Sequence, residues 1–141
     1  MAAWQALVHA HHHVIRRLDR ELREEHDLPL AGYDVLLRLA RAPARALRMT
    51  DLAARVMLSP SGLTRLVDRL VARGLVHRRT DPQDGRVALA SLTDDGLRQL
   101  RRAARTHLRG IREHFTGRLD ETQLRGVAAS LETIAGPHLP H

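Results

Sequence analysis

Apolar residues recur at spacings of three and four along most of the chain, which is the period of an amphipathic helix. Between residues 75 and 92 the pattern changes to two short strand-like runs, which flank the turn-rich segment Asp81–Arg86. The sequence therefore predicts a mainly α-helical fold that contains one small β-hairpin. The predicted helices cover residues 3–26, 31–42, 50–57, 59–73, 94–117 and 120–135.

Residue types at the expected helix ends support these boundaries. Ser59 is a good N-cap, and Pro60 suits the first helical position because its missing N–H does no harm there. Thr50 and Asp51 are expected to open the third helix as its cap and first-turn acid, and Thr93 is expected to cap the fifth.

Composition narrows the classes of function. The chain has 141 residues, enough for one domain with a sizeable core. Its net charge is +7, and all 23 residues counted as Lys or Arg are Arg. A basic domain favours an anionic partner, most often nucleic acid. The absence of Cys excludes disulfide frameworks, cysteine-ligated metal clusters and thiol nucleophiles. The chain contains no Lys and no recognisable catalytic motif, so we expect neither an enzyme nor a cofactor.

The chain has no segment that suggests contact with a membrane. No apolar run approaches the roughly 18 residues that a membrane span needs, and histidines and charges interrupt the N-terminal segment, unlike a signal peptide. We therefore expect a cytoplasmic protein with no membrane partner.

The order of the elements predicts a helix-turn-helix followed by a wing. A short helix at 50–57 is joined by a tight connection to the helix at 59–73, and the hairpin comes next. In this arrangement the first residues of the second helix can reach base edges in the major groove. The basic hairpin tip can reach the adjacent minor groove. Double-stranded DNA is therefore the expected partner.

Four motifs in this region are similar to those of the MarR family, the multiple antibiotic resistance regulators. They are Ser59–Leu70, Gly74–Val76, Asp81–Arg86 and Leu92–Gly96, and they follow one another in the family's order and spacing. The resemblance covers essentially the whole chain. It implies a winged helix-turn-helix transcription factor that acts as a homodimer, with the N-terminal helix and the last two helices forming the dimer interface.

This resemblance implies a single domain over residues 1–141. Residues 30–93 would form the DNA-binding lobe, residues 1–29 and 94–135 the dimerisation helices, and residues 136–141 a loose tail. The apolar seams Trp4–Leu22 and Leu97–Phe115 agree with a dimer, because they are too long for a compact winged-helix core to cover. They need each other or a second chain.

Small hydroxyl residues and arginines on the second helix and the wing are the candidate DNA contacts. The set is Ser59, Pro60, Ser61, Thr64, Arg65, Arg69, Arg78, Arg79 and Arg86. Arg86 matches the residue that family members insert into the minor groove, and Asp84 is expected to hold the wing by pairing with a nearby Arg. The tip departs from the family's common Asp-Arg-Arg, because Gly85 replaces the first Arg, which predicts one phosphate contact fewer.

MarR-type proteins often bind a small molecule between the dimerisation helices and the DNA-binding lobe. The resemblance implies that such a pocket could be lined by Trp4, His11, Tyr33, His107 and Ile111. An effector such as an aromatic acid is considered for it, and the alternative is that these residues are interface core. Sensing through a thiol is excluded because the chain has no Cys.

The main hypothesis is a ligand-responsive repressor on a pseudo-palindromic operator, and other functions stay open. A non-specific architectural DNA-binding protein would share the basic charge, although small polar residues at the start of the 59–73 helix argue against it. A winged helix that contacts only proteins is a further alternative. A zinc-responsive regulator could use His9 and His13, whose spacing can chelate a metal, but we expect this pair to be a surface run and no metal to bind.

Overall fold

The structure of the protein, a computed structural model, describes residues 1–136. The loose tail expected at 136–141 therefore lies, apart from Gly136, outside the described residues. The elements in chain order are α1 (Ala2–His26), α2 (Leu30–Arg41), η1 (Pro43–Arg45), β1 (Ala46–Arg48), α3 (Met49–Val56), α4 (Pro60–Ala72), β2 (Val76–Thr80), β3 (Ala88–Leu92), α5 (Asp94–His114), η2 (Thr116–Arg118) and α6 (Glu121–Ala135).

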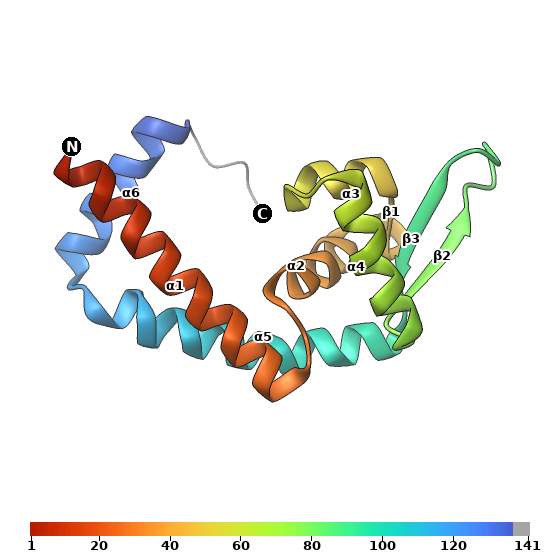
Figure 1. Ribbon diagram of the computed structural model, residues 1–141, viewed down its shortest axis with the longest axis horizontal. Coiled ribbons are helices and arrows are strands. Elements are labelled where there is room, and N and C mark those ends of the chain that lie inside the picture. The colour runs from red at the N-terminus through yellow and green to blue at the C-terminus, as the bar shows by residue number, and fades with distance from the viewer. Residues whose placement is uncertain (137–141) are drawn as a thin grey trace.

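The long helix α5 connects two ends of the molecule (Figure 1). Near its beginning lie α2, α3, α4 and the β2–β3 hairpin, and at its other end lie α6 and the N-terminal part of α1. The mainly helical winged helix-turn-helix fold expected from the sequence is confirmed. No helix within residues 1–136 combines the length and apolar character that crossing a membrane requires.

The sheet has three strands and not the two of the expected hairpin. Its order is β1-β3-β2 and both pairings are antiparallel, with Leu47 and Arg78 lying on either side of Ala90. The prediction that the hairpin is the whole sheet was therefore wrong. β1 has only three residues, too few for an alternating pattern to be visible, and it forms because β3 offers it an unpaired edge.

Helix α2 lies at the centre of the core. Val35, Leu36 and Leu39 are fully buried in it and join one core cluster with residues of the neighbouring helices and strands. The largest fully buried side chains of the described chain are Leu22, Leu28, Leu36, Leu39, Leu52, Leu63, Leu70, Val35, Val67 and Val76.

Two helix ends differ from the expectation. Helix α3 begins at Met49 with Arg48 as its N-cap and no side-chain cap, so the prediction that Thr50 caps it was wrong. β1 runs directly into the helix, which places Thr50 inside the first turn. Helix α5 ends at His114, and the turn η2 follows where the helix was expected to continue to residue 117.

Helix α5 packs against α1 mainly through small and polar residues, and its leucine seam is buried near its beginning but exposed further along. Leu108 on that seam is 60% exposed and Phe115 is 37% exposed. At Gly110 the helices come so close that a Cβ atom would lie 2.6 Å from Leu18 Cδ2 and 2.6 Å from Glu21 Oε2. The residues of α5 that are buried are Gly96, Gln99, Leu100, Ala103, Thr106, Gly110 and His114.

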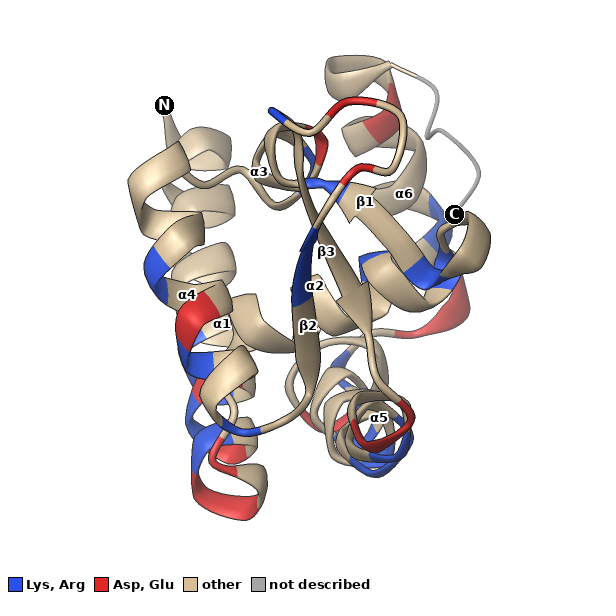
Figure 2. Cartoon of the chain, turned by 90° about the vertical axis from the view of Figure 1, so that its right-hand side faces the viewer, with Lys and Arg blue, Asp and Glu red and all other residues tan. Residues whose placement is uncertain are grey.

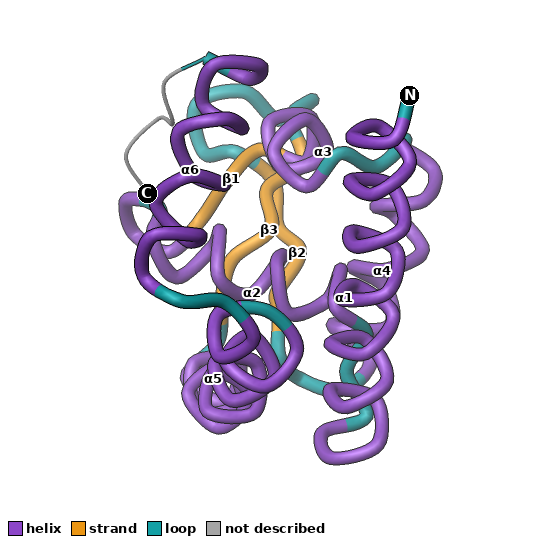
Figure 3. The backbone as a smooth tube through the Cα atoms, turned by 90° about the vertical axis from the view of Figure 1, so that its left-hand side faces the viewer, coloured by secondary structure: helices purple, strands orange, loops and turns teal. Residues whose placement is uncertain are grey.

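Much apolar surface of α1 and α6 is uncovered within the chain. Only Leu18 and Leu22 of α1 are buried, whereas Trp4 is 63% exposed. Helix α6 has no buried residue, and its Ile134 is 76% exposed. Figure 3 shows why, because α1 and α6 stand apart from each other on opposite sides of the view.

Candidate nucleic-acid interface

Ser59 fixes the start of α4. Its Oγ accepts a hydrogen bond from the backbone N–H of Gly62 at 3.1 Å, and Pro60 occupies the first helical position, as the sequence predicts. The hydroxyl oxygens of Ser59 and Ser61 lie 3.4 Å apart. This N-terminal end of α4 is exposed. The positive end of the α4 dipole is therefore accessible to an anion such as a DNA phosphate.

The two faces of α4 differ in exposure. The inner face is buried in the core through Leu63, Leu66, Val67 and Leu70. The outer face consists of polar residues that are all exposed, namely Ser61, Thr64, Arg65, Asp68 and Arg69. The helix therefore presents hydroxyl and guanidinium donors outward from a backbone that the core holds in place.

The loop between β2 and β3 is held by two aspartates. Asp81 Oδ1 accepts from the backbone N–H of Gln83 at 2.8 Å, and Asp84 Oδ1 accepts from the backbone N–H of Arg86 at 3.0 Å. The Arg86 side chain is 94% exposed, and its Nε lies 3.5 Å from Asp84 Oδ1. Asp84 thus shapes the backbone that carries Arg86 and also pairs with its side chain, which extends into solvent.

The other wing arginines differ in their surroundings. Arg78 forms an ion pair with Asp68 of α4 at 3.0 Å, which ties the wing to that helix. Arg48 lies 3.7 Å from Asp81, so β1 supports the base of the loop. Arg79 is exposed and has no ion-pair partner among residues 1–136. Figure 2 shows the basic residues of β2 in blue, on the face toward the viewer.

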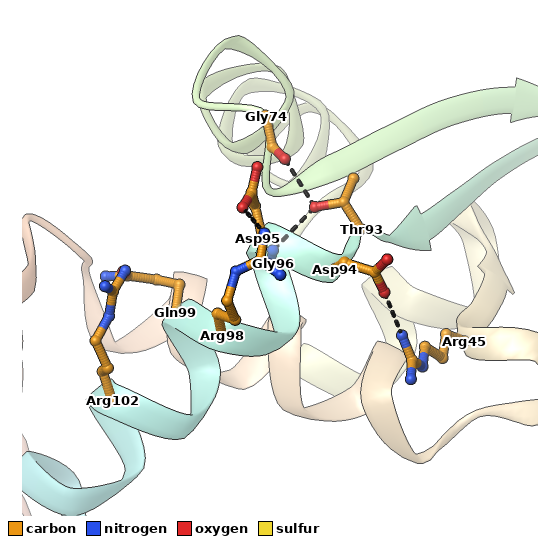
Figure 4. A network of polar contacts seen from close by, with 9 residues as sticks. All are labelled: Arg45, Gly74, Thr93, Asp94, Asp95, Gly96, Arg98, Gln99 and Arg102. Carbon is orange, nitrogen blue, oxygen red and sulfur yellow. Dashed lines mark hydrogen bonds and ion pairs between the residues drawn. The ribbon is translucent and has the colours of Figure 1, made fainter.

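Thr93 joins the end of α4 to the start of α5 (Figure 4). Its hydroxyl donates to the Gly74 carbonyl at 2.7 Å and accepts from the Gly96 backbone N–H at 2.9 Å. A Cβ atom at Gly96 would lie 2.1 Å from the carbonyl oxygen of Leu75, so only glycine fits there. The Leu-Thr-x-x-Gly motif therefore has a geometric role, because it sets the angle at which the wing leaves the long helix.

Arg73 makes a second junction that the sequence pattern did not indicate. It follows α4, and its guanidinium donates to the backbone carbonyls of Asp27 at 2.5 Å and His26 at 3.1 Å. The Gln99 side-chain amide of α5 donates to the same His26 carbonyl at 3.1 Å. The end of α1 is therefore bound to both the end of α4 and α5. An exposed Arg after a helix gives no sign of a partner 46 residues away.

A cavity of about 570 Å³ opens between α1, α2, α3 and α5. The Tyr33 and His107 rings meet there with centroids 4.5 Å apart. Burial raises the pKa of Tyr33 and lowers the pKa of His107, and His107 Nδ1 is buried without a hydrogen-bond partner among residues 1–136. The lining residues are Ile15, Arg16, Leu18, Asp19, Leu30, Ala31, Tyr33, Asp34, Leu37, Val56 and His107.

The cavity contains two of the five residues expected to line a ligand pocket. Tyr33 and His107 line it, whereas Trp4, His11 and Ile111 do not. Trp4 and His11 lie on the exposed first half of α1, which extends away from α3, α4 and the β2–β3 hairpin. The helical period places Trp4 and His11 on the same face of α1 as Leu18. It does not show that the rest of the chain covers only the second half of that face.

His9 and His13 lie beside a shallow surface hollow. Both are exposed, and the hollow is also lined by Arg16 and Arg17. Partial desolvation and the nearby charge of Arg17 lower the pKa of His13. Within residues 1–136, neither histidine belongs to a group of three side chains that could share a metal ion.

Comparisons with known proteins agree with this geometry. A sequence model of the MarR family matches residues 26–87. An uncharacterized HTH-type transcriptional regulator of Bacillus cereus is 30% identical over 107 residues, which cover 76% of this chain and 69% of that protein. The crystal structure of Sco3205, a MarR family transcriptional regulator from Streptomyces coelicolor in complex with DNA, has a TM-score of 0.87 and 33% identity, and the match covers 99% of this chain and 90% of that chain.

The chain belongs to the MarR family of transcriptional regulators. This MarR protein is a DNA-binding regulator and not an enzyme, as the sequence predicts. A further match is CouR from Rhodococcus jostii RHA1 bound to p-coumaroyl-CoA, with a TM-score of 0.75 and 30% identity over 96% of this chain and 92% of that one.

Proposed function

We propose that this MarR protein is a ligand-responsive repressor that binds a pseudo-palindromic operator in double-stranded DNA as a homodimer. The observation that carries the proposal is the exposed polar face of α4 beside an exposed wing tip. Ser61, Thr64 and Arg65 would read the major groove, and Arg86 would enter the minor groove. Arg69 and Arg79 would contact phosphates, and so would Arg78 if it exchanges its partner Asp68 for a phosphate.

The homodimer is supported by the apolar surface that one chain leaves uncovered. Leu108 of α5 and Ile134 of α6 are 60% and 76% exposed, and both helices belong to the expected interface. Exposed apolar side chains that gather on the same helices indicate a protein interface. Two α4 helices in a dimer would meet half-sites about 10 bp apart, centre to centre, which accounts for a pseudo-palindrome.

The effector would occupy the cavity between α1, α2, α3 and α5. Its lining is mainly apolar and includes the Tyr33 and His107 rings, which are tilted by 31° to each other and suit contact with an aromatic group. The carboxylates of Asp19 and Asp34 are paired with Arg23 and Arg38, whereas Arg16 has no ion-pair partner among residues 1–136. A free guanidinium beside an aromatic site favours an aromatic acid.

Effector binding would act by changing the populations of two conformations of the dimer, one that fits the operator and one that does not. The cavity touches both the dimerisation helices and the DNA-binding lobe, so a bound molecule would favour one separation of the two recognition helices over another. The proposal includes the cytoplasmic location expected from the sequence, because a transcriptional regulator must be in the same compartment as its DNA.

The test uses DNA fragments that the full chain selects from a random double-stranded pool. In a mobility-shift titration, the wild type should bind a selected fragment much more tightly than an unrelated fragment of the same length. Arg86→Ala should weaken binding by about 10-fold, because it removes the minor-groove contact and one charge, with no change in thermal stability.

Arg112→Ala is the matched control for this experiment. Arg112 is exposed near the end of α5 that lies far from the wing, and its replacement removes the same charge. It should change affinity by less than about 2-fold at physiological salt. Equal losses for both variants, or equal binding of selected and unrelated fragments, would favour the non-specific architectural protein instead.

A further inference from the structure

Glu21 of α1 and Glu113 and His114 of α5 form a cluster that the DNA-binding scheme does not use. Each residue offers one ligand atom, and the three atoms lie within 4.8 Å of one another. Among residues 1–136 this is the one group of three or more His and acidic side chains with that geometry. It lies where α1 packs against α5.

The centre of the cluster is buried. The His114 side chain is 5% exposed and the Glu21 side chain 22% exposed, and His114 Nε2 lies 2.5 Å from Glu21 Oε1. Glu21 Oε2 is buried as well, and it has no hydrogen-bond partner within residues 1–136. A buried carboxylate oxygen without a partner is costly unless a cation satisfies it.

Gly110 makes the close approach of Glu21 possible. A Cβ atom at this position would lie 2.6 Å from Glu21 Oε2, so a larger residue would push that carboxylate away from α5. His114 follows Gly110 by one helical turn on the same face of α5, and Glu113 is its exposed neighbour. The sequence therefore brings one imidazole and two carboxylates together at the α1–α5 contact.

We propose that Glu21, Glu113 and His114 bind one divalent transition-metal ion, with Zn²⁺ as the expected occupant. One imidazole and two carboxylates are ligands that Zn²⁺ accepts, and three protein ligands leave a fourth position for water. Zn²⁺ should bind more tightly than Mn²⁺ at such a site. Binding requires the His114 Nε2 and Glu21 Oε1 atoms to move apart from 2.5 Å to about 3.3 Å, the separation of ligands around a tetrahedral Zn²⁺.

This site differs from the His9 and His13 pair considered from the sequence. Those two residues are exposed beside Arg16 and Arg17, whose positive charges oppose a metal ion. The Glu21 cluster supplies two negative charges, which favour a metal ion and offset the charge of Arg118, whose Nε donates to the Glu113 carbonyl at 2.9 Å.

The test is a calorimetric titration of the untagged, chelator-treated full chain with Zn²⁺. The wild type should bind one ion per chain at this site. Glu113→Gln should weaken that binding by at least about 10-fold, because it removes an anionic ligand, and it should leave the metal-free fold unchanged because Glu113 is exposed. The control variant His9→Gln/His13→Gln should bind as the wild type does.

A second readout uses Co²⁺ in place of Zn²⁺. The visible absorption of the Co²⁺-loaded wild type should be lost in Glu113→Gln and kept in the control. The proposal is overturned if the wild type binds no Zn²⁺, if Glu113→Gln binds as tightly as the wild type, or if only the His9/His13 variant loses binding. Because no DNA is present in these measurements, their failure would leave the proposed function untouched.

Discussion

At the scale of single residues, the strongest constraints lie where backbones meet. The Thr93 hydroxyl forms hydrogen bonds with Gly74, before the wing, and with Gly96, after it. Because Gly96 has no side chain, the first turn of α5 can contact the Leu75 carbonyl. The sequence predicted the cap at Thr93, since the hydroxyl precedes two acidic residues of a helix. It did not predict the bond to Gly74, because the partner lies 19 residues away.

Replacing Gly96 by Ala should destabilise the protein. The added methyl group would overlap the Leu75 carbonyl, and relieving that overlap should cost about 1–3 kcal/mol of the free energy of unfolding. Urea denaturation followed by circular dichroism measures the change.

Gly126→Ala provides the comparison. Gly126 lies inside α6, and a Cβ atom there meets nothing within 4 Å. Alanine should therefore be neutral or stabilising by up to about 1 kcal/mol. Equal effects of the two substitutions would mean that helix propensity, and not the contact with Leu75, determines the result at Gly96.

At the scale of elements, α5 shows what periodicity leaves undecided. Its leucine seam is covered only in part, because Leu100 is buried whereas Leu108 is exposed. The chain also buries the stripe that contains Gln99, Thr106 and Gly110. This stripe suits α1 because small residues allow close approach and polar ones pair with its acidic side chains. Thr106, for example, donates to Glu25 Oε2 at 2.9 Å. The exposed part of the seam, which contains Leu108 and Phe115, is then available to a second chain.

Leu108→Asp should convert the proposed dimer into a monomer. The residue is 60% exposed within one chain, so the folded monomer should tolerate the charge, whereas an apolar interface should not. Light scattering coupled to size-exclusion chromatography should give the mass of one chain at micromolar concentration, where the wild type gives two.

Met57→Asp serves as the control for the dimer. Met57 is 91% exposed at the end of α3, in the DNA-binding lobe, and makes the same change from apolar to acidic. It should leave the mass at two chains. A dimeric Leu108→Asp variant would place the interface elsewhere.

At the scale of the whole molecule, the cavity and the junctions lie between the two ends of α5. Arg73 ties the recognition helix to the end of α1, and the cavity uses the neighbouring part of α1 together with α2 and α5. A molecule bound there would therefore contact the segments that hold α4 and the wing against α1 and α5. In the proposed dimer, this arrangement would link effector binding to the positions of the two α4 helices.

An aromatic acid should release this MarR protein from its selected DNA fragment. We expect 4-hydroxycinnamate to weaken the mobility shift, whereas its uncharged methyl ester should do so at least about 10-fold less effectively, because it cannot pair with Arg16. Arg16→Met should remove the difference between the two compounds. Identical effects of acid and ester on the wild type would contradict the role of Arg16.

The sequence by itself determined the helices, the hairpin, the caps at Ser59 and Thr93, and the helix-turn-helix order. These features depend on local periodicity and on bonds within one helical turn, so neighbouring residues specify them. The tertiary structure decided the third strand, the ion pair of Arg78 with Asp68, and which face of α5 is buried. Each of these depends on segments that are distant along the chain, and an apolar stripe does not reveal whether its own chain or another one covers it.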